Sequence, residues 1–133
     1  MTTTINASTS SGLVQTADGS GIIKVQSNGV TTNALAWVVF NGTTTGTNAP
    51  TAAYNVSSVT RTSTGLYSIA FTNALSDANY STVGIGGSST TVNGVTFEAP
   101  VRTAQTTSAV QIAIVTHAGA LIDVDYVTAA VFR

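Results

Sequence analysis

The sequence predicts an all-β protein, either an antiparallel β-sandwich or a small, jelly-roll-like barrel. Threonine, serine, asparagine and glycine dominate, whereas the strong helix formers glutamate, lysine, glutamine, arginine and methionine are scarce. Short apolar runs recur with turn residues between them, and none sustains a helical period. A length of 133 residues favours a single domain.

The first 33 residues differ from the rest of the chain. Their apolar side chains form short clusters separated by polar turns, so this stretch carries too little apolar surface to fold alone. We expect residues 1–33 to form an extended arm that attaches to or intertwines with partner chains. The candidate contacts of this arm are Ile5, Leu13, Val14, Ile22, Ile23 and Val25.

Residues 34–133 are predicted to form the β head. The apolar run 34–40 is the first strong strand, and residues 41–51 form a polar loop after it. Residues 54–62 and 66–71 both alternate, and the short connection between them predicts a β-hairpin. Further strands are expected at 80–85, 95–99, 108–116 and 121–132.

The aromatic side chains of the head are predicted to pack in its core, Trp37 above all, because it lies inside an apolar run. The aromatic residues concerned are Trp37, Tyr54, Tyr67, Phe71, Tyr80, Tyr126 and Phe132. The alternative interpretation is that the same residues form a platform on which sugars stack.

Charged residues make up only 7% of the chain, and the net charge is −1. An uncharged, hydroxyl-rich surface suits a protein packed against copies of itself, because few charges must leave water when the copies meet. The four basic residues are scattered rather than gathered in a stripe, which argues against a nucleic-acid partner. We therefore expect a homo-oligomer.

Several segments together resemble a family of bacteriophage virion proteins, chiefly the C-terminal domains of tail fibres. Residues 4–10, 15–21 and 25–32 resemble a leader common in fibres of phages of aquatic bacteria. The strand and turn at 36–43, the hairpin segments 54–60 and 65–72, the turn Ala74-Leu75-Ser76-Asp77-Ala78-Asn79-Tyr80 and the ending Val131-Phe132-Arg133 are also similar to the family. The resemblance implies a β-rich homotrimer on the outer surface of a virion, assembled in the host cytoplasm.

The polar loop 86–94 is the candidate receptor-contact site, because binding residues often lie on loops held by a rigid scaffold. The candidate contacts are Ser88, Ser89, Thr90, Thr91 and Asn93. The alternative is that the loop is a plain mobile connection.

No arrangement of residues indicates catalysis, a metal or a cofactor. His117 is the single histidine, and no nucleophile-elbow motif accompanies it. Asp123 and Asp125 stand two apart on a predicted strand, so they are expected to share a face. Such a pair could serve glycoside hydrolysis or bind Ca²⁺, but a solvated strand face or ion pairs to Arg102 or Arg133 of a neighbour are favoured.

Three functions follow as expectations. The first is a short trimeric tail fibre that attaches to a host-surface glycan and to tail or baseplate proteins. The second is a capsid decoration (cement) protein bound to the major capsid protein. The third and most remote is a glycan-degrading enzyme. The absence of cysteines leaves no disulfide or thiolate site, and no apolar run is long enough for membrane insertion.

Overall fold

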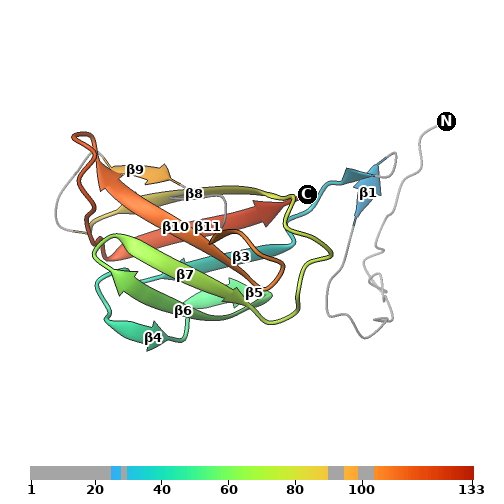
Figure 1. Ribbon diagram of the computed structural model, residues 1–133, viewed down its shortest axis with the longest axis horizontal. Helices are drawn as coiled ribbons and strands as arrows, with labels where there is room; N and C mark the ends of the chain where they lie inside the picture. Colours follow the sequence, from blue (N-terminus) through green and yellow to red (C-terminus); the bar gives the residue numbers. More distant parts are fainter. Residues whose placement is uncertain (1–24, 28–29, 90–94, 99–103) are drawn as a thin grey trace, which may run out of the picture.

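The computed structural model describes residues 25–27, 30–89, 95–98 and 104–133 (Figure 1). The described residues form strands and turns without an α-helix, which confirms the all-β class. The strands are β1 (Gln26–Ser27), β2 (Val30–Thr31), β3 (Ala36–Phe40), β4 (Gly46–Asn48), β5 (Ala52–Tyr54), β6 (Val56–Ser63), β7 (Leu66–Phe71), β8 (Ser81–Gly87), β9 (Val95–Glu98), β10 (Ala109–Thr116) and β11 (Tyr126–Phe132).

Two antiparallel sheets make up the head. One has five strands in the order β4-β6-β7-β10-β9, and the other has four in the order β5-β3-β11-β8. Strands β1 and β2 pair only with each other among the described strands. The described strands do not close into a barrel, so the barrel form of the prediction is not what this chain adopts there. No described helix has the length and apolar character needed to cross a membrane.

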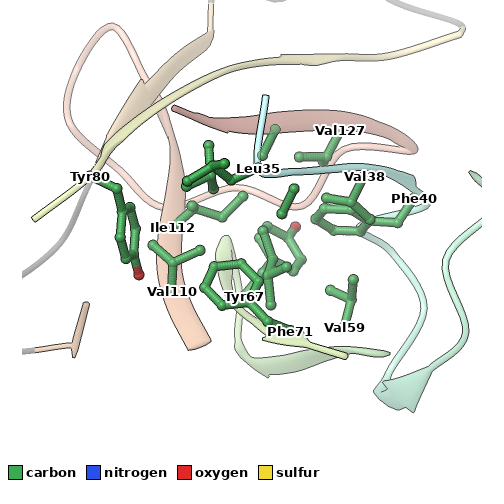
Figure 2. Close-up of a cluster of buried hydrophobic side chains, with 14 of the residues drawn as sticks. Leu35, Val38, Phe40, Val59, Tyr67, Phe71, Tyr80, Val110, Ile112 and Val127 are labelled. Carbon is green, nitrogen blue, oxygen red and sulfur yellow. The ribbon is translucent and has the colours of Figure 1, made fainter. Parts of the chain in front are cut away.

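One hydrophobic core lies between the two sheets (Figure 2). The four-stranded sheet contributes Val38, Phe40 and Val127 to it, and the five-stranded sheet contributes side chains such as Tyr67 and Ile112. The rings of Phe40 and Tyr67 meet edge to face across the sheets, with centroids 5.1 Å apart. Every second residue of each central strand therefore points at the opposite sheet.

The predicted hairpin at 54–71 is confirmed in its main part. Strands β6 and β7 pair from Val56↔Phe71 to Ser63↔Leu66. The turn between them needs a residue with positive φ, and Gly65 supplies it at 66° without the strain of a side chain.

The prediction of one continuous strand over residues 54–62 is wrong, because the chain changes sheets at Asn55. Strand β5 pairs with β3 in the four-stranded sheet, whereas β6 belongs to the five-stranded sheet. Asn55 has a φ of 54°, and its buried amide nitrogen donates to the carbonyl oxygens of Leu35 and Asn73, each at 3.2 Å. Its amide oxygen accepts from the backbone N–H of Asn73 at 2.8 Å. These bonds hold the crossover.

Other strand boundaries also shift. The loop expected at 41–51 contains the short strand β4, and β8 continues through Gly87 into the expected loop. The last strand begins at Tyr126 rather than at Leu121. Strands β8 and β9 belong to different sheets yet contact each other at Gly84, where an added Cβ would lie 2.6 Å from Cδ2 of Phe97. Glycine at this position therefore lets the Phe97 ring lie against β8.

The prediction that the aromatic residues all lie in the core is wrong for four of them. Tyr67, Phe71 and Tyr80 are buried, as expected, whereas Tyr54 is half-buried and shares the outward face with its register partner Trp37. Trp37, Tyr126 and Phe132 are exposed by 39%, 51% and 37%. The reason is the strand period: the neighbours of these four residues face the core, so their own side chains must point outward.

Candidate functional site

The loop after β8 and the segment before β11 lie side by side. Gly87, the last residue of β8, pairs with Tyr126, the first residue of β11. This register brings Ser88 and Ser89, two of the predicted receptor contacts, next to Asp125 and Tyr126. The other predicted contacts in this loop, Thr90, Thr91 and Asn93, lie outside the described residues.

Ser89 binds both oxygens of the Asp125 carboxylate. Its backbone N–H donates to Oδ1 at 2.9 Å, and its hydroxyl donates to Oδ2. The hydroxyl bond, aided by the backbone bond, lowers the pKa of Asp125 below its usual value. Asp125 is therefore a carboxylate at neutral pH, and each of its oxygens keeps a lone pair that can accept a further hydrogen bond.

A shallow hollow of about 390 Å³ opens between these residues and is lined by Gly87, Ser88, Ser89, Asp125 and Tyr126. The ring of Tyr126 supplies its apolar wall, and the carboxylate and serine residues supply polar groups. An exposed aromatic ring beside hydrogen-bonding groups can hold a ligand with both an apolar face and hydroxyl groups. We call this hollow, with its five lining residues, the Tyr126 hollow.

Asp123 has a structural role that separates it from Asp125. It forms an ion pair with Arg61 at 2.5 Å from Nη2 to Oδ2, and it accepts from the Gly65 backbone N–H at 2.8 Å. The Tyr67 hydroxyl donates to it at 3.1 Å. The hydrogen bond from Arg61 is the largest cause of a lowered Asp123 pKa, and Asp123 clamps the β6–β7 turn to the chain that enters β11.

The expectation that Asp123 and Asp125 share a strand face is therefore wrong. Both precede β11, and their side chains bind different partners: Arg61 for one and Ser89 for the other. Arg133, offered as a partner of these aspartates, pairs within the chain with Asp77 at 2.6 Å. Arg102 lies outside the described residues. Within the described ranges, no three His, Asp or Glu residues gather where they could hold a metal ion.

His117 lies in an exposed turn after β10, two residues before Gly119. A second hollow of about 230 Å³ lies beside Arg61 and is lined by residues of β3, β4, β6 and β7 and of the loops on either side of β4. Its arginine is already held by Asp123, so we assign this hollow no ligand.

Outward-pointing apolar side chains cover the four-stranded sheet. The strand register places Tyr54, Trp37, Ala130 and Val83 in one row across β5, β3, β11 and β8. This row has no polar side chain except the Tyr54 hydroxyl.

The adjacent row runs Ala52, Val39, Thr128 and Ile85 across the same four strands. We call these two rows, with Tyr126 and Phe132 at the ends of β11, the apolar face. Val83 and Ile85 on it are exposed by 53% and 60%. No charged residue occurs in any of the four strands.

Sequence reasoning places Tyr126 in the core, with a sugar-stacking platform as the alternative, and it misses the apolar face. The signal that could have found this face is that both alternating sets of side chains are apolar in 36–40 and nearly so in 126–132, which is typical of strands covered on both faces. The arm candidates Ile5, Leu13, Val14, Ile22 and Ile23 lie outside the described residues, and Val25 is half exposed beside β1.

Comparisons with protein-family models, with curated proteins and with solved structures find no match to this chain.

Proposed function

We propose that this chain is a non-enzymatic surface protein of a bacteriophage particle that attaches the virion to glycans on its host. In this proposal, three copies, each a jelly-roll-like β-sandwich, form a short tail fibre. The virion setting rests on the sequence resemblance and on the low charge. The observation that carries the attachment role is the Tyr126 hollow, where the predicted loop meets a carboxylate and an exposed aromatic ring.

The chemistry of the hollow suits a sugar. The C–H face of a pyranose ring can stack on the exposed ring of Tyr126, which offers apolar area at low entropic cost. Hydroxyl groups of the sugar can donate to the free lone pairs of the Asp125 carboxylate. A hollow with so few groups binds one sugar weakly, and several copies that meet a repeated polysaccharide multiply the binding by avidity.

Binding of the purified full chain to an array of bacterial surface polysaccharides tests this role. We expect Tyr126→Ala to lower binding at least about tenfold, because the stacking surface is lost. The matched control is Leu121→Ala, which removes another exposed apolar side chain that does not line the hollow. The attachment role fails if no polysaccharide binds, or if Tyr126→Ala binds as the unaltered chain does.

A capsid decoration protein is the second candidate, and the observation that favours it is the breadth of the apolar face compared with the small hollow. Copy number per virion separates the two candidates, by quantitative mass spectrometry against the major capsid protein. A few to tens of copies support a fibre. Hundreds of copies support decoration of the head.

A further inference from the structure

The two outer faces of the head differ in polarity. On the five-stranded sheet, one outward row is wholly polar and runs Thr47, Thr60, Ser68 and Gln111, and the hydroxyls of Thr47 and Thr60 bond at 2.8 Å. The outward apolar residues beside this row include Ala113 and Val115, which are buried rather than exposed. Thr96 and Glu98 continue this polar surface on β9. An antiparallel sheet that faces water on one side normally shows this pattern of apolar inside and polar outside.

The four-stranded sheet breaks that pattern. Five of the large hydrophobic side chains exposed in the described chain lie on its apolar face, including Trp37, Val83 and Ile85. Single exposed hydrophobic residues are common on soluble proteins, but a contiguous patch with no charge marks an interaction surface. We propose that the two rows of the apolar face form the surface through which copies of this chain associate, with Tyr126 at the end of β11 outside the contact.

The absence of charge favours a second copy as the occupant. Strands β3, β5, β8 and β11 contain no charged residue, so the face offers no complementarity to an acidic or basic partner. When two such faces meet, no charge has to be desolvated. The inference rests on the self-association in the proposed function, but it pairs two copies about a twofold axis instead of joining three, and it does not depend on glycan binding.

The arrangement of side-chain sizes also fits a second copy. A twofold axis parallel to the strands, between β3 and β11, would place the face of one copy on that of another with each row facing itself. In the first row, Trp37 would then meet Ala130 of the second copy, and Tyr54 would meet its Val83. Each large ring would lie over a smaller side chain, which is the condition for close packing.

The second row shows the same relation. Ala52 would meet Ile85 of the second copy, so the smallest side chain of the row would face the largest. Val39 would meet Thr128, which has nearly the same shape. A face that is complementary to itself in both rows is what an isologous interface requires.

The size of the face sets the expected strength of association. At about 4.8 Å between strands and 3.4 Å per residue, the four strands cover roughly 360 Å² of sheet in each copy. A pair then buries roughly 700 Å² of flat sheet area, which is below the about 1,000 Å² of a stable interface and fits a weak, transient one. We therefore expect an equilibrium that depends on protein concentration.

The primary test is the mass of the full chain by size exclusion with light scattering, from about 1 to 200 µM. We expect dimers whose share of the protein rises with concentration. Ile85→Lys should weaken association about 100-fold or more, because it places an unpaired charge in the interface. The matched control is Thr96→Lys, which adds the same charge at an exposed outward position on the edge strand of the other sheet and should leave the mass unchanged. Circular dichroism shows whether each variant keeps the fold.

Two results would overturn the inference: a chain that stays monomeric at the highest concentration, or an Ile85→Lys variant that associates like the unaltered chain. A monomer that instead pellets with empty capsids or floats with lipid vesicles would assign the face to that other partner. Glycan binding by the monomeric Ile85→Lys variant, weaker only because avidity is lost, would show that the attachment role does not require association through the apolar face.

A cross-linking experiment covers the case in which Ile85→Lys misfolds. The chain has no cysteine, so Ala52→Cys/Ile85→Cys introduces the only two thiols. Within one copy these positions are three strand spacings apart, roughly 14 Å, whereas facing sheets lie about 10 Å apart. A bismaleimide too short for the first distance should link two copies at high yield. Failure to form covalent oligomers at concentrations where the mass shows oligomers would refute this use of the face.

Discussion

Replacement of Asp123 by alanine should destabilise the head more than any other change of a charged residue in the described chain. The carboxylate accepts hydrogen bonds from the Arg61 guanidinium, the Gly65 N–H and the Tyr67 hydroxyl, and its side chain is 23% exposed. Loss of the charge-assisted bond and two unsatisfied donors would cost about 3 kcal/mol after allowance for solvent access. For a head of this size, that corresponds to a fall in Tm of roughly 15 °C.

Thermal unfolding followed by circular dichroism, at one fixed protein concentration, measures this effect. The control is Asp125→Ala, which removes the neighbouring carboxylate that binds Ser89 instead of the β6–β7 turn. We expect Asp125→Ala to leave Tm nearly unchanged. A fall in Tm of less than about 5 °C for Asp123→Ala would refute the clamp, since it corresponds to about 1 kcal/mol.

The same clamp predicts a dependence on pH. The hydrogen bond from Arg61 lowers the Asp123 pKa, so the folded state prefers the carboxylate. This stabilisation is complete above the unfolded pKa of about 3.9 and is lost as the pH falls through the lower folded value. The difference in Tm between the unaltered chain and Asp123→Asn should therefore shrink below about pH 4. A difference that stays constant down to about pH 2 would contradict this account.

Two further predictions concern the core and the crossover. Asn55→Ala should cost about 3 kcal/mol in urea unfolding, because it strains a residue with positive φ and removes three hydrogen bonds. Asn55→Gly loses the same hydrogen bonds but not the backbone conformation, so its free energy of unfolding should lie between those of the unaltered chain and Asn55→Ala. If Asn55→Gly and Asn55→Ala are equally stable, the backbone of Asn55→Ala is not strained. Burial raises the pKa of Tyr80 to about 12 and that of Tyr67 as well. Since the folded state prefers the protonated phenols, stability should be complete below about pH 10 and decline from there to pH 12. Tyrosinate absorbance that rises near pH 10 for these two residues, before unfolding, would count against their burial.

Local patterns were sufficient for most strands but not for their sheet membership. The alternation of residues 66–71 and 108–116 predicts two strands with Ile69 and Ile112 inward, and the head has both. The alternation at 54–62 looks continuous in the same way, yet the chain changes sheets at Asn55. The bonds that hold Asn55 come from Leu35 and Asn73, about twenty residues away on either side, and local alternation carries no information about them.

The candidate site was predictable only in part. The polar loop predicts Ser88 and Ser89 as contacts, and both line the Tyr126 hollow. The spacing of Asp123 and Asp125 predicts a shared strand face, whereas the strand starts at Tyr126 and the two carboxylates bind different elements. Their roles depend on which distant segments, the β6–β7 turn or the loop after β8, come to lie beside them.

By itself, the sequence determined the all-β class and the positions of most strands, because side-chain alternation and turn residues act over a few neighbours along the chain. It also determined the scarcity of charge, which is a matter of composition. Only the tertiary structure decided which of two apolar sets in a strand faces the core. In 36–40 both alternating sets of side chains are apolar. The opposite sheet covers only one side of this strand, so Val38 is buried and Trp37 is exposed. The side left uncovered is the apolar face, and its existence depends on the order β5-β3-β11-β8, which brings together residues from four separate parts of the chain.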